Sequence, residues 1–557
     1  MPKRLNSPVI SFDRVSYRHS EELDPVVNNV SFAIHQGDGV LIAGPSGAGK
    51  STITMLMNGI LPANGSGVME GSIHWFGTPA SEWTSGAVSK HIGMMFQDPE
   101  SQFCMTTVEE ELAFGLENLH LPREEMKSRI ISSLLQTGLA GYEKRVIQSL
   151  SGGQKQRVAL ACLLAMKTDI LLLDEPFANI DPLSRLELIQ CLAQLKRTLD
   201  LTIVVIDHDL NGWVEWMNRA ILLDSEGSIQ VNQPLKEALT QRYEVFDQLT
   251  IDLPLFIQLQ QGQAGLTVNE QEWRKRITEE QVNRIRQKQD SVKHEISLSP
   301  PVIEVNNLSY SVKEHLILRD ISLTIREGET VAFCGHNGAG KSTLALLIAG
   351  LFPDYEGTIS LKGRPVEEYA NQEIRSEIGY VFQNPEHQFV EHTVVDDVGF
   401  GLRVKKLDAD MIKQRVQATL QKIGLSGYED RHPLSLSQGQ KRRLSVAGMT
   451  IDDLNILLLD EPTYGQDAHS MKNLVRMLKQ RQMEGKTTLI VTHDMELVHR
   501  LADRTILLSN GEIKFQGTAD AMWDLGEVFL KQHGLLLPPS VRLQQWIGGF
   551  QHVAAHH

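Results

Sequence analysis

The chain has 557 residues, of which 41% are hydrophobic and 22% are charged, and its formal net charge at pH 7 is -15. This length predicts about three to four domains, with enough apolar mass for sizeable cores. The negative balance disfavours a nucleic-acid partner, because the surface as a whole would repel phosphate backbones. No run of roughly 18 apolar residues occurs, so we do not expect the chain to span a membrane.

Cysteine usage and the first residues both favour a cytosolic protein. The cysteines are far apart and form no Cys-x-x-Cys pair: Cys104, Cys162, Cys191 and Cys334. This pattern favours reduced, mostly buried thiols and offers no zinc site. Residues 1–6 carry a little positive charge, but no apolar stretch of signal-peptide length follows them, so we expect no leader.

The first chemical motif follows the apolar run 40–43, which predicts a strand leading into a glycine-rich loop and then a helix. Glycines let the backbone wrap around phosphate groups with its N–H groups pointing inward. The positive end of the following helix favours an anion at the same place. A lysine supplies charge to the outer phosphates, and a serine can hold Mg²⁺. The candidate phosphate-binding residues are Gly44, Gly47, Gly49, Lys50, Ser51 and Thr52.

Further polar motifs follow this loop in the first half. Asp174 ends an apolar run and Glu175 comes next, an order that predicts a magnesium-binding aspartate and a glutamate that orients or deprotonates the attacking water. A lone glutamine, Gln97, lies earlier, and His208 follows another strand-like run. Between them lies the motif Leu150-Ser151-Gly152-Gly153-Gln154.

The sequence repeats all of these elements in the same order. Lys50 and Lys341 are separated by 291 residues, the glutamine, serine–glycine and aspartate–glutamate motifs return after 286, and the histidine returns after 285. Five elements in one order at nearly constant offset exclude coincidence. The counterparts are Gly335, Gly338, Gly340, Lys341, Ser342, Thr343, Gln383, Ser437, Gly439, Gln440, Asp460, Glu461 and His493.

Strand-like apolar runs that lead into glycine turns and helical patterns predict an α/β fold with a parallel sheet in each half. We expect a first ATPase domain over 1–242, an appendage and linker over 243–300, a second ATPase domain over 301–525 and a helical appendage over 526–557. The linker is polar and helical in pattern near 270–289. The two tails resemble each other, since Glu244-Val245-Phe246 matches Glu527-Val528-Phe529.

Together these motifs resemble the nucleotide-binding domains of ATP-binding-cassette (ABC) proteins over nearly all of both halves. The resemblance implies two tandem P-loop domains, each with a helical subdomain and a small C-terminal helical appendage. It also implies that the two halves pair, so that the signature loop of one domain covers ATP held by the phosphate loop of the other. Ser437, Gly439 and Gln440 would then face Lys50. Ser151, Gly153 and Gln154 would face Lys341.

The resemblance also assigns roles to the remaining motifs. Gln97 and Gln383 would reach the metal or the water and sense the partner, and His208 and His493 would contact the γ-phosphate. The implied magnesium ligands are Ser51, Asp174 and Gln97 in one half and Ser342, Asp460 and Gln383 in the other. Tyr17 and Tyr310, ahead of the phosphate loops, resemble the aromatic residue that stacks on adenine, a contact worth about 1–3 kcal/mol.

One position departs from the family pattern, because Gln438 stands where the first half has Gly152. If this position needs a positive φ, glutamine there costs roughly 1–2 kcal/mol. If it does not, the loop is intact. Both halves keep their glutamate and histidine, so we predict two hydrolytic sites, which need not be equal.

The stretches that contain the two glutamines resemble one subgroup of the ABC family more specifically. Phe96–Phe103 and Phe382–Phe389 are similar to those of the ATPases of energy-coupling-factor importers, which take up vitamins and transition metals, and Leu537-Pro538-Pro539 is similar to their C-terminal appendage. Two such domains in one chain resemble ATPases assigned to thiamine or its pyrimidine precursor. The implied partners are integral membrane subunits, a transmembrane coupling protein and a substrate-binding membrane protein. The implied location is peripheral, at the cytoplasmic face of the cell membrane.

Two other classes of tandem ATPase fit the sequence less well. A soluble factor acting on ribosomes also joins two cassettes, but its linker should be basic. Residues 243–299 hold nine acidic and seven basic side chains, a net of 7 minus 9, or -2. A DNA-repair or chromosome-organising ATPase would bring zinc modules or long heptad insertions, and neither is present.

Overall fold

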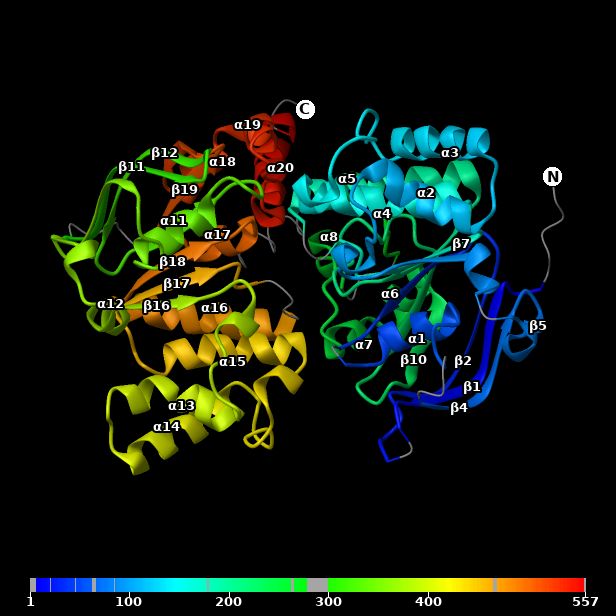
Figure 1. Cartoon of the computed structure of the whole chain (residues 1–557), viewed down its shortest axis with the longest axis horizontal. Helices are drawn as coiled ribbons and strands as arrows, with labels where there is room; N and C mark the ends of the chain where they lie inside the picture. Colours follow the sequence, from blue (N-terminus) through cyan, green and yellow to red (C-terminus); the bar gives the residue numbers. More distant parts are fainter. Residues whose placement is uncertain are drawn as a thin grey trace. The chain divides into compact units, whose positions relative to one another are not determined.

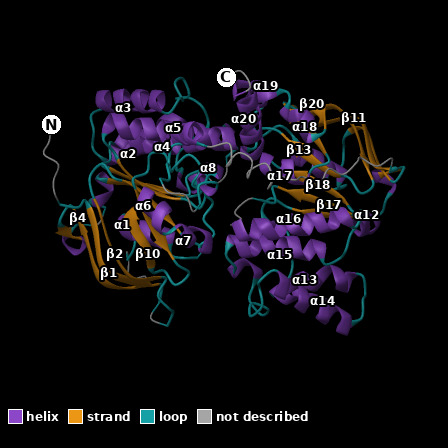
Figure 2. Ribbon diagram, turned by 180° about the vertical axis from the view of Figure 1, so that it is seen from behind, coloured by secondary structure: helices purple, strands orange, loops and turns teal. Residues whose placement is uncertain are grey.

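A computed structural model describes residues 7–20, 22–45, 47–62, 67–84, 86–177, 180–261, 265–277, 299–463 and 468–554, with side chains left out at 371, 438, 468–469 and 548–554. The chain divides into two compact units, one for each half of the sequence (Figure 1). Each unit combines strands with helices, drawn in orange and purple in Figure 2. The predicted α/β fold is therefore confirmed in both halves.

The described part of the first unit has a six-stranded sheet in the order β10-β9-β3-β8-β7-β6. All neighbours in it are parallel except β10, which runs antiparallel to β9. The strands are β3 (Gly39–Ala43), β6 (Ile92–Met95), β7 (Ile170–Asp174), β8 (Thr202–Ile206), β9 (Arg219–Leu223) and β10 (Ile229–Pro234). An antiparallel sheet in the order β2-β1-β4-β5 accompanies it, formed by β1 (Ile10–Arg18), β2 (Val27–Ile34), β4 (Val68–Trp75) and β5 (Thr78–Pro79).

The second unit repeats this topology strand for strand, in the order β16-β17-β18-β13-β19-β20. Its strands are β13 (Thr330–Cys334), β16 (Ile378–Val381), β17 (Ile456–Asp460), β18 (Thr487–Val491), β19 (Arg504–Ser509) and β20 (Glu512–Gly517). The smaller sheet, β12-β11-β14-β15, contains β11 (Pro301–Val312), β12 (His315–Arg326), β14 (Glu356–Leu361) and β15 (Arg364–Pro365). The duplication seen in the sequence is thus a duplication of structure.

The central strands explain why the polar motifs meet. β7 and β17 both read Ile-Leu-Leu-Leu-Asp and are buried along their whole length, as expected for parallel strands covered on both faces. Asp174 pairs with Ile206 at the end of β8, and Asp460 pairs with Val491 at the end of β18. The carboxyl ends of neighbouring strands are therefore level, and the residues that follow them lie at one edge of the sheet.

Helices cover the sheets and form a separate subdomain in each unit. The subdomains consist of α2 (Val108–Asn118), α3 (Arg123–Gln136) and α4 (Gly152–Met166), and of α13 (Val394–Val404), α14 (Ala409–Lys422) and α15 (Gln438–Thr450), each with its own apolar core. Caps fix their starts: the Thr107 and Thr393 side chains accept hydrogen bonds from the backbone N–H groups of Glu110 and Asp396. The other helices of the two α/β cores are α1 (Lys50–Met57), α5 (Pro182–Leu199), α11 (Lys341–Ile348), α12 (Asn371–Glu377), α16 (Ala468–Met483) and α17 (Met495–Leu501).

Each unit ends in a group of helices, as the two similar tails suggest, and the last of them, α20, is 16 residues long. They are α6 (Leu235–Gln241), α7 (Tyr243–Gln248), α8 (Leu255–Gln258) and α9 (Glu270–Arg276), and α18 (Ala519–Trp523), α19 (Gly526–Gln532) and α20 (Pro539–Ala554). The matched segments fall in α7 and α19, and both are followed by a residue with positive φ, Thr250 at 56° and Gly534 at 73°. The helix predicted near 270–289 is present from 270 to 276, and its part from 278 onward lies outside the described residues. Within the described ranges, no helix combines the length and apolarity needed to cross a bilayer.

Candidate nucleotide sites

The predicted site residues of each half follow adjacent strands of one sheet. In the first half, β3 leads into the phosphate loop, β8 is followed by His208, β7 by Glu175 and β6 by Gln97, and these four strands are neighbours in the order β3-β8-β7-β6. The second half repeats the arrangement with β13, β18, β17 and β16. The carboxyl edge of an open parallel sheet is where such folds bind ligands.

Each phosphate loop is held in shape by its own lysine. Lys50 Nζ donates to the carbonyl oxygens of Gly44 at 2.9 Å and Pro45 at 2.8 Å, and Lys341 Nζ donates to Gly335 and His336, both at 2.9 Å. Burial lowers the pKa of both lysines, while the nearby carboxylates oppose the shift. Ser46, within the first loop, lies outside the described residues.

The glycines of the loops provide backbone conformations that other residues rarely adopt. Gly47 and Gly49 have φ values of 85° and 77°, and Gly338 and Gly340 have 82° and 96°. A Cβ added to Gly49 would lie 2.4 Å from the Val26 carbonyl oxygen, so this backbone approach requires glycine. Helices α1 and α11 begin directly after these glycines, and each directs its N-terminus at the loop, as anion binding requires.

The two predicted catalytic glutamates have strained backbones. Glu175 has a φ of 42° and Glu461 a φ of 46°, in the left-handed region that costs a residue with a side chain roughly 1–2 kcal/mol. The neighbouring strand holds each in place, because the backbone N–H of Glu175 donates to Ile206 and that of Glu461 donates to Val491, both at 2.9 Å. Strain of this kind is typical of functional positions.

In the first half, the glutamate is bonded to the glutamine. Gln97 Nε2 donates to Glu175 Oε2 at 3.0 Å, and His208 Nδ1 lies 3.7 Å from Glu175 Oε1. Burial acts to lower the pKa of His208, but the nearby carboxylate of Glu175, with Asp207 and Asp209, raises it to about 9. Burial acts to raise the pKa of Glu175, whereas His208 and Lys50 lower it overall. The pair therefore rests as imidazolium and carboxylate at neutral pH.

In the second half, the glutamate is bonded to the histidine. His493 Nδ1 lies 2.9 Å from Glu461 Oε1, and the other oxygen, Oε2, is buried and has no partner among the described residues. Ser342 Oγ donates to Asp460 Oδ1 at 3.0 Å. Burial raises the pKa of Asp460, and the equivalent Asp174 reaches about 6 for the same reason. Burial thus favours the protonated form of both aspartates, although Lys50 and Arg442 oppose the shift.

The two signature motifs cap helices in the same way. Ser151 and Ser437 are the N-cap residues of α4 and α15, and each forms a reciprocal pair of hydrogen bonds with the glutamine three residues on. Gln438 is the first residue of α15, a position with helical backbone dihedrals. Position 438 therefore does not need a positive φ, and glutamine leaves the backbone of the loop intact. No hydrogen bond joins these motifs to the phosphate loop of their own half within the described residues.

The two tyrosines are placed differently. Tyr17 is 1% exposed and belongs to the core of the first unit, with its hydroxyl directly beside the backbone of Gly67. Tyr310 is partly exposed and stacks on Phe352, with ring centroids 5.9 Å apart. In this structure only Tyr310 offers part of its ring to a base, and adenine stacking remains a prediction for both.

The sequence did not reveal several buried or partly buried residues that contact the predicted site residues or their neighbours. Arg442 and Tyr380 contact the aspartate–glutamate segment of the second half. In the first half, Arg185 binds Asp207 Oδ2 at 3.0 Å and Asp209 Oδ2 at 3.1 Å, beside His208. The offset of 286 residues could have revealed the first two, because Met94 and Gln156 stand at the corresponding positions.

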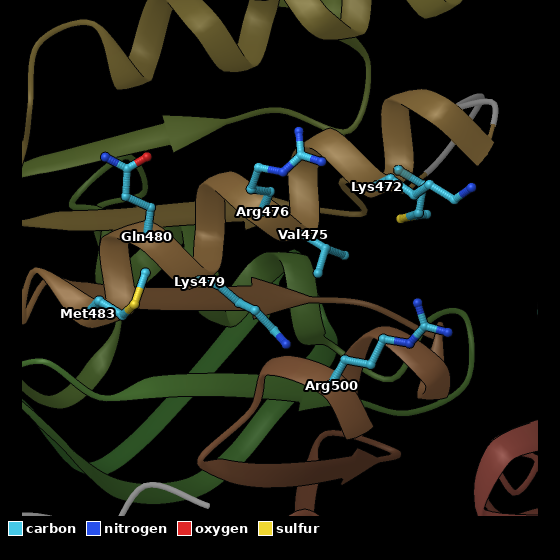
Figure 3. Close-up of a pocket in the computed structure, with 8 residues that line it drawn as sticks. Lys472, Val475, Arg476, Lys479, Gln480, Met483 and Arg500 are labelled. Carbon is cyan, nitrogen blue, oxygen red and sulfur yellow. The ribbon is translucent and has the colours of Figure 1, made fainter. Parts of the chain in front are cut away.

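One cavity lies away from all of these residues. It measures about 610 Å³ and is lined by residues of α16 and α17, among them Lys472, Arg476, Lys479 and Arg500 (Figure 3). No predicted site residue lines it. The two candidate nucleotide sites are therefore assigned from side-chain chemistry, and this cavity plays no part in the assignment.

Comparisons with known proteins agree with the motif assignment. A family model described as "ABC transporter" matches residues 27–178 and again residues 318–464. A Bacillus subtilis protein named "Putative HMP/thiamine import ATP-binding protein YkoD" is 37% identical over 542 residues, covering 97% of this chain and 96% of that protein. A Methanosarcina acetivorans protein named "Putative ABC transporter ATP-binding protein" is 33% identical over 559 residues, covering 97% and 91%.

A solved structure also resembles part of the chain. It is that of cbiO1 from Clostridium perfringens, which its description calls part of the ABC transporter complex cbiONQ. The identity is 32%, the match covers 42% of this chain and 94% of that one, and the TM-score is 0.37.

Proposed function

This chain belongs to the ABC transporter family and is an ATPase of that family, and from that premise we propose that it is the energising subunit of an energy-coupling-factor-type importer. It would couple ATP hydrolysis to uptake of a vitamin or another micronutrient. The name of the Bacillus subtilis relative, which aligns with nearly the whole chain, supports thiamine or its pyrimidine precursor as the solute.

One observation carries the enzymatic part of the proposal. In both halves, a lysine-bearing phosphate loop, an aspartate–glutamate pair and a histidine follow adjacent parallel strands. ATP phosphates would be bound by the loop N–H groups, the helix N-terminus and Lys50. Glu175 would orient the attacking water and accept its proton, and His208 would contact the γ-phosphate. Lys341, Glu461 and His493 would act in the same way in the second half.

The residues present also fit a magnesium ion. Ser342 and Asp460 are within hydrogen-bond distance of each other at the start of α11, and a hydroxyl with a carboxylate is the oxygen donor set that Mg²⁺ prefers. Ser51 and Asp174 are the matching pair, and the glutamines Gln97 and Gln383 would complete the two sets. The ion, when bound with ATP, would neutralise charge on the phosphate oxygens.

The proposal extends to how the halves cooperate. Each signature loop would cover the ATP bound by the other half, so that ATP binding joins the halves and hydrolysis releases them. Shifting such an equilibrium from 1:99 to 99:1 requires about 5.5 kcal/mol of differential binding. Two sites with several charge-assisted contacts each can supply this amount. The motion would be transmitted to a transmembrane coupling protein and a substrate-binding membrane protein, with the chain bound peripherally at the cytoplasmic face.

Uptake and ATP hydrolysis by the complete complex test the proposal. Cells lacking the native protein should regain uptake of labelled thiamine or its pyrimidine precursor with the wild-type chain, and not with the Glu175→Gln, Glu461→Gln double variant. Affinity purification of the wild-type chain should recover integral membrane proteins. Recovery with ribosomes instead, or uptake that does not depend on the two glutamates, would replace the importer with a soluble tandem ATPase.

A further inference from the structure

The helix that carries the second signature motif holds a buried arginine whose two terminal nitrogens both donate to the backbone of the site, while its Nε is buried and has no partner among the described residues. Arg442 in α15 is 1% exposed. Its Nη1 group donates to the carbonyl oxygens of Phe382 and, at 3.3 Å, of Gln383, directly after β16. Its Nη2 group donates to those of Asp460 and Glu461, both at 2.7 Å, at the end of β17. One guanidinium thus joins the signature helix to the backbone of the glutamine loop and of the aspartate–glutamate segment.

A tyrosine adds a second connection in the same half. Tyr380 in β16 is 7% exposed, and its hydroxyl donates to Asp460 Oδ2 at 3.1 Å. Because Ser342 donates to Oδ1, both carboxylate oxygens of Asp460 are held. The aspartate is therefore fixed from two strands and from the helix after the phosphate loop.

The first half has neither connection. Met94 stands in place of Tyr380, and Gln156 stands in place of Arg442. An amide has only two N–H donors, so Gln156 cannot bind four carbonyl oxygens. Gln156 is 1% exposed, and its Oε1 is buried with no partner among the described residues. Instead, Gln97 bonds to the Glu175 side chain at 3.0 Å.

We propose that Arg442, supported by Tyr380, is a positioning residue for the second ATP site, and that it makes the two sites functionally unequal. The planar guanidinium fixes several acceptors at once, which a flexible amide cannot do. The second glutamine loop and Glu461 would move together with the signature helix, whereas the first glutamine loop can move without breaking such contacts. The proposal rests on the ATPase function proposed above.

Single-site turnover tests this role. In a full-length chain carrying Glu175→Gln, only the second site hydrolyses ATP. Adding Arg442→Gln should lower kcat about tenfold or more through misplacement of the reacting groups, while KM for ATP changes less than about threefold. Arg442→Lys should not restore kcat, because an ammonium group lacks the planar fork. Tyr380→Phe, which removes one hydroxyl, should lower kcat roughly two- to tenfold. This variant replaces Arg442→Gln in the test if Arg442→Gln does not fold.

A matched control separates positioning from general stability. Arg481 is 5% exposed and donates to the Leu454 carbonyl oxygen at 2.9 Å, away from the nucleotide site. Arg481→Gln should lower the melting temperature about as much as Arg442→Gln and leave kcat within twofold. Equal losses of kcat in both variants, or an unchanged kcat in Arg442→Gln, would overturn the proposal.

Hydrogen exchange measured without nucleotide is a second test of whether Arg442 restrains the glutamine loop, and it does not require ATPase activity. Backbone amides of residues 382–388 should exchange faster in Arg442→Gln than in the wild type, and those of residues 96–102 should be unchanged. If the wild-type chain hydrolyses no ATP in its complex, the proposed function fails, and the exchange of residues 382–388 still decides whether Arg442 restrains the glutamine loop. Unchanged exchange there would reject the restraint itself.

Discussion

Gln97 Nε2 and Glu175 Oε2 are joined by a hydrogen bond of 3.0 Å. This contact makes the basicity of Glu175 sensitive to the residue at position 97. Gln97→Glu would place a second carboxylate beside Glu175, and a like charge at this distance raises the pKa of a carboxyl group. In a Glu461→Gln chain, the acid limb of the kcat/KM profile for ATP should move about one pH unit upward. An acid limb that does not move would mean that Glu175 does not titrate in that limb.

Lys50 is the one basic residue of the first phosphate loop and should contribute strongly to ATP affinity. Its Nζ donates hydrogen bonds to two carbonyl oxygens of the loop, and the residue itself is the first of α1. We expect Lys50→Ala to weaken ATP binding about 10- to 100-fold, as the loss of a charge-assisted contact predicts. Calorimetric titration of a Lys341→Ala chain isolates the first site. Lys196→Ala is the control, because Lys196 Nζ also binds a loop carbonyl, Gly37 at 2.5 Å, but away from the phosphate loop.

Two glycines of the first loop should differ in their tolerance of alanine. Gly47 has positive φ and no heavy atom within 4 Å of an added Cβ, so Gly47→Ala should cost only the backbone strain of about 1–2 kcal/mol. Gly49 has the same constraint and, in addition, the Val26 carbonyl oxygen 2.4 Å from the added Cβ. Gly49→Ala should therefore be clearly the more destabilising in urea unfolding. Equal midpoints for the two variants would show that the loop rearranges freely.

His208 should make the stability of the first unit depend on pH. Its folded pKa of about 9 is above the ordinary value of 6.5, so the stabilisation is fully present below pH 6.5 and is lost as pH rises through about 9. The difference in melting temperature between wild type and His208→Gln, without nucleotide, should be largest near pH 6 and vanish near pH 10. In a Glu175→Gln background the difference should shrink, because the main partner of the imidazolium is removed. A difference that is constant across this range would contradict the ion pair.

Restoring glycine at position 438 should not improve the second signature loop. Gln438 is the first helical residue of α15, a position that does not require the left-handed conformation. We expect Gln438→Gly to leave ATP turnover of a Glu175→Gln chain within twofold and to lower stability by at most about 1 kcal/mol. A large gain in ATP turnover would contradict this expectation and show that Gln438 impairs the second signature loop.

The sequence predicted the fold and the grouping of the site because both follow from local patterns. The strand predicted before Lys341 is β13, Thr330–Cys334, and the run 40–43 lies within β3. Polar residues after apolar strands meet at one edge because parallel strands end level, and no long-range information is needed for that inference.

What the sequence did not predict depends on packing between distant segments. The burial of Tyr17 depends on the Gly67 backbone beside its hydroxyl. The φ of Gln438 could be decided only by seeing where α15 begins. The four acceptors of Arg442 lie at or just after the ends of two strands, 18 to 60 residues away in the chain, so a short stretch of sequence does not show its role. Such contacts are set by tertiary structure alone.

The placement of both catalytic sets within a single polypeptide changes what one amino-acid replacement can do. In an assembly of identical subunits, every replacement enters both sites together, so a variant that improves one role must be tolerated in the other. Here Tyr380 and Met94, or Arg442 and Gln156, are encoded separately and can diverge independently. A chain that encodes its two predicted ATP sites separately thus allows one site to change while the other stays the same.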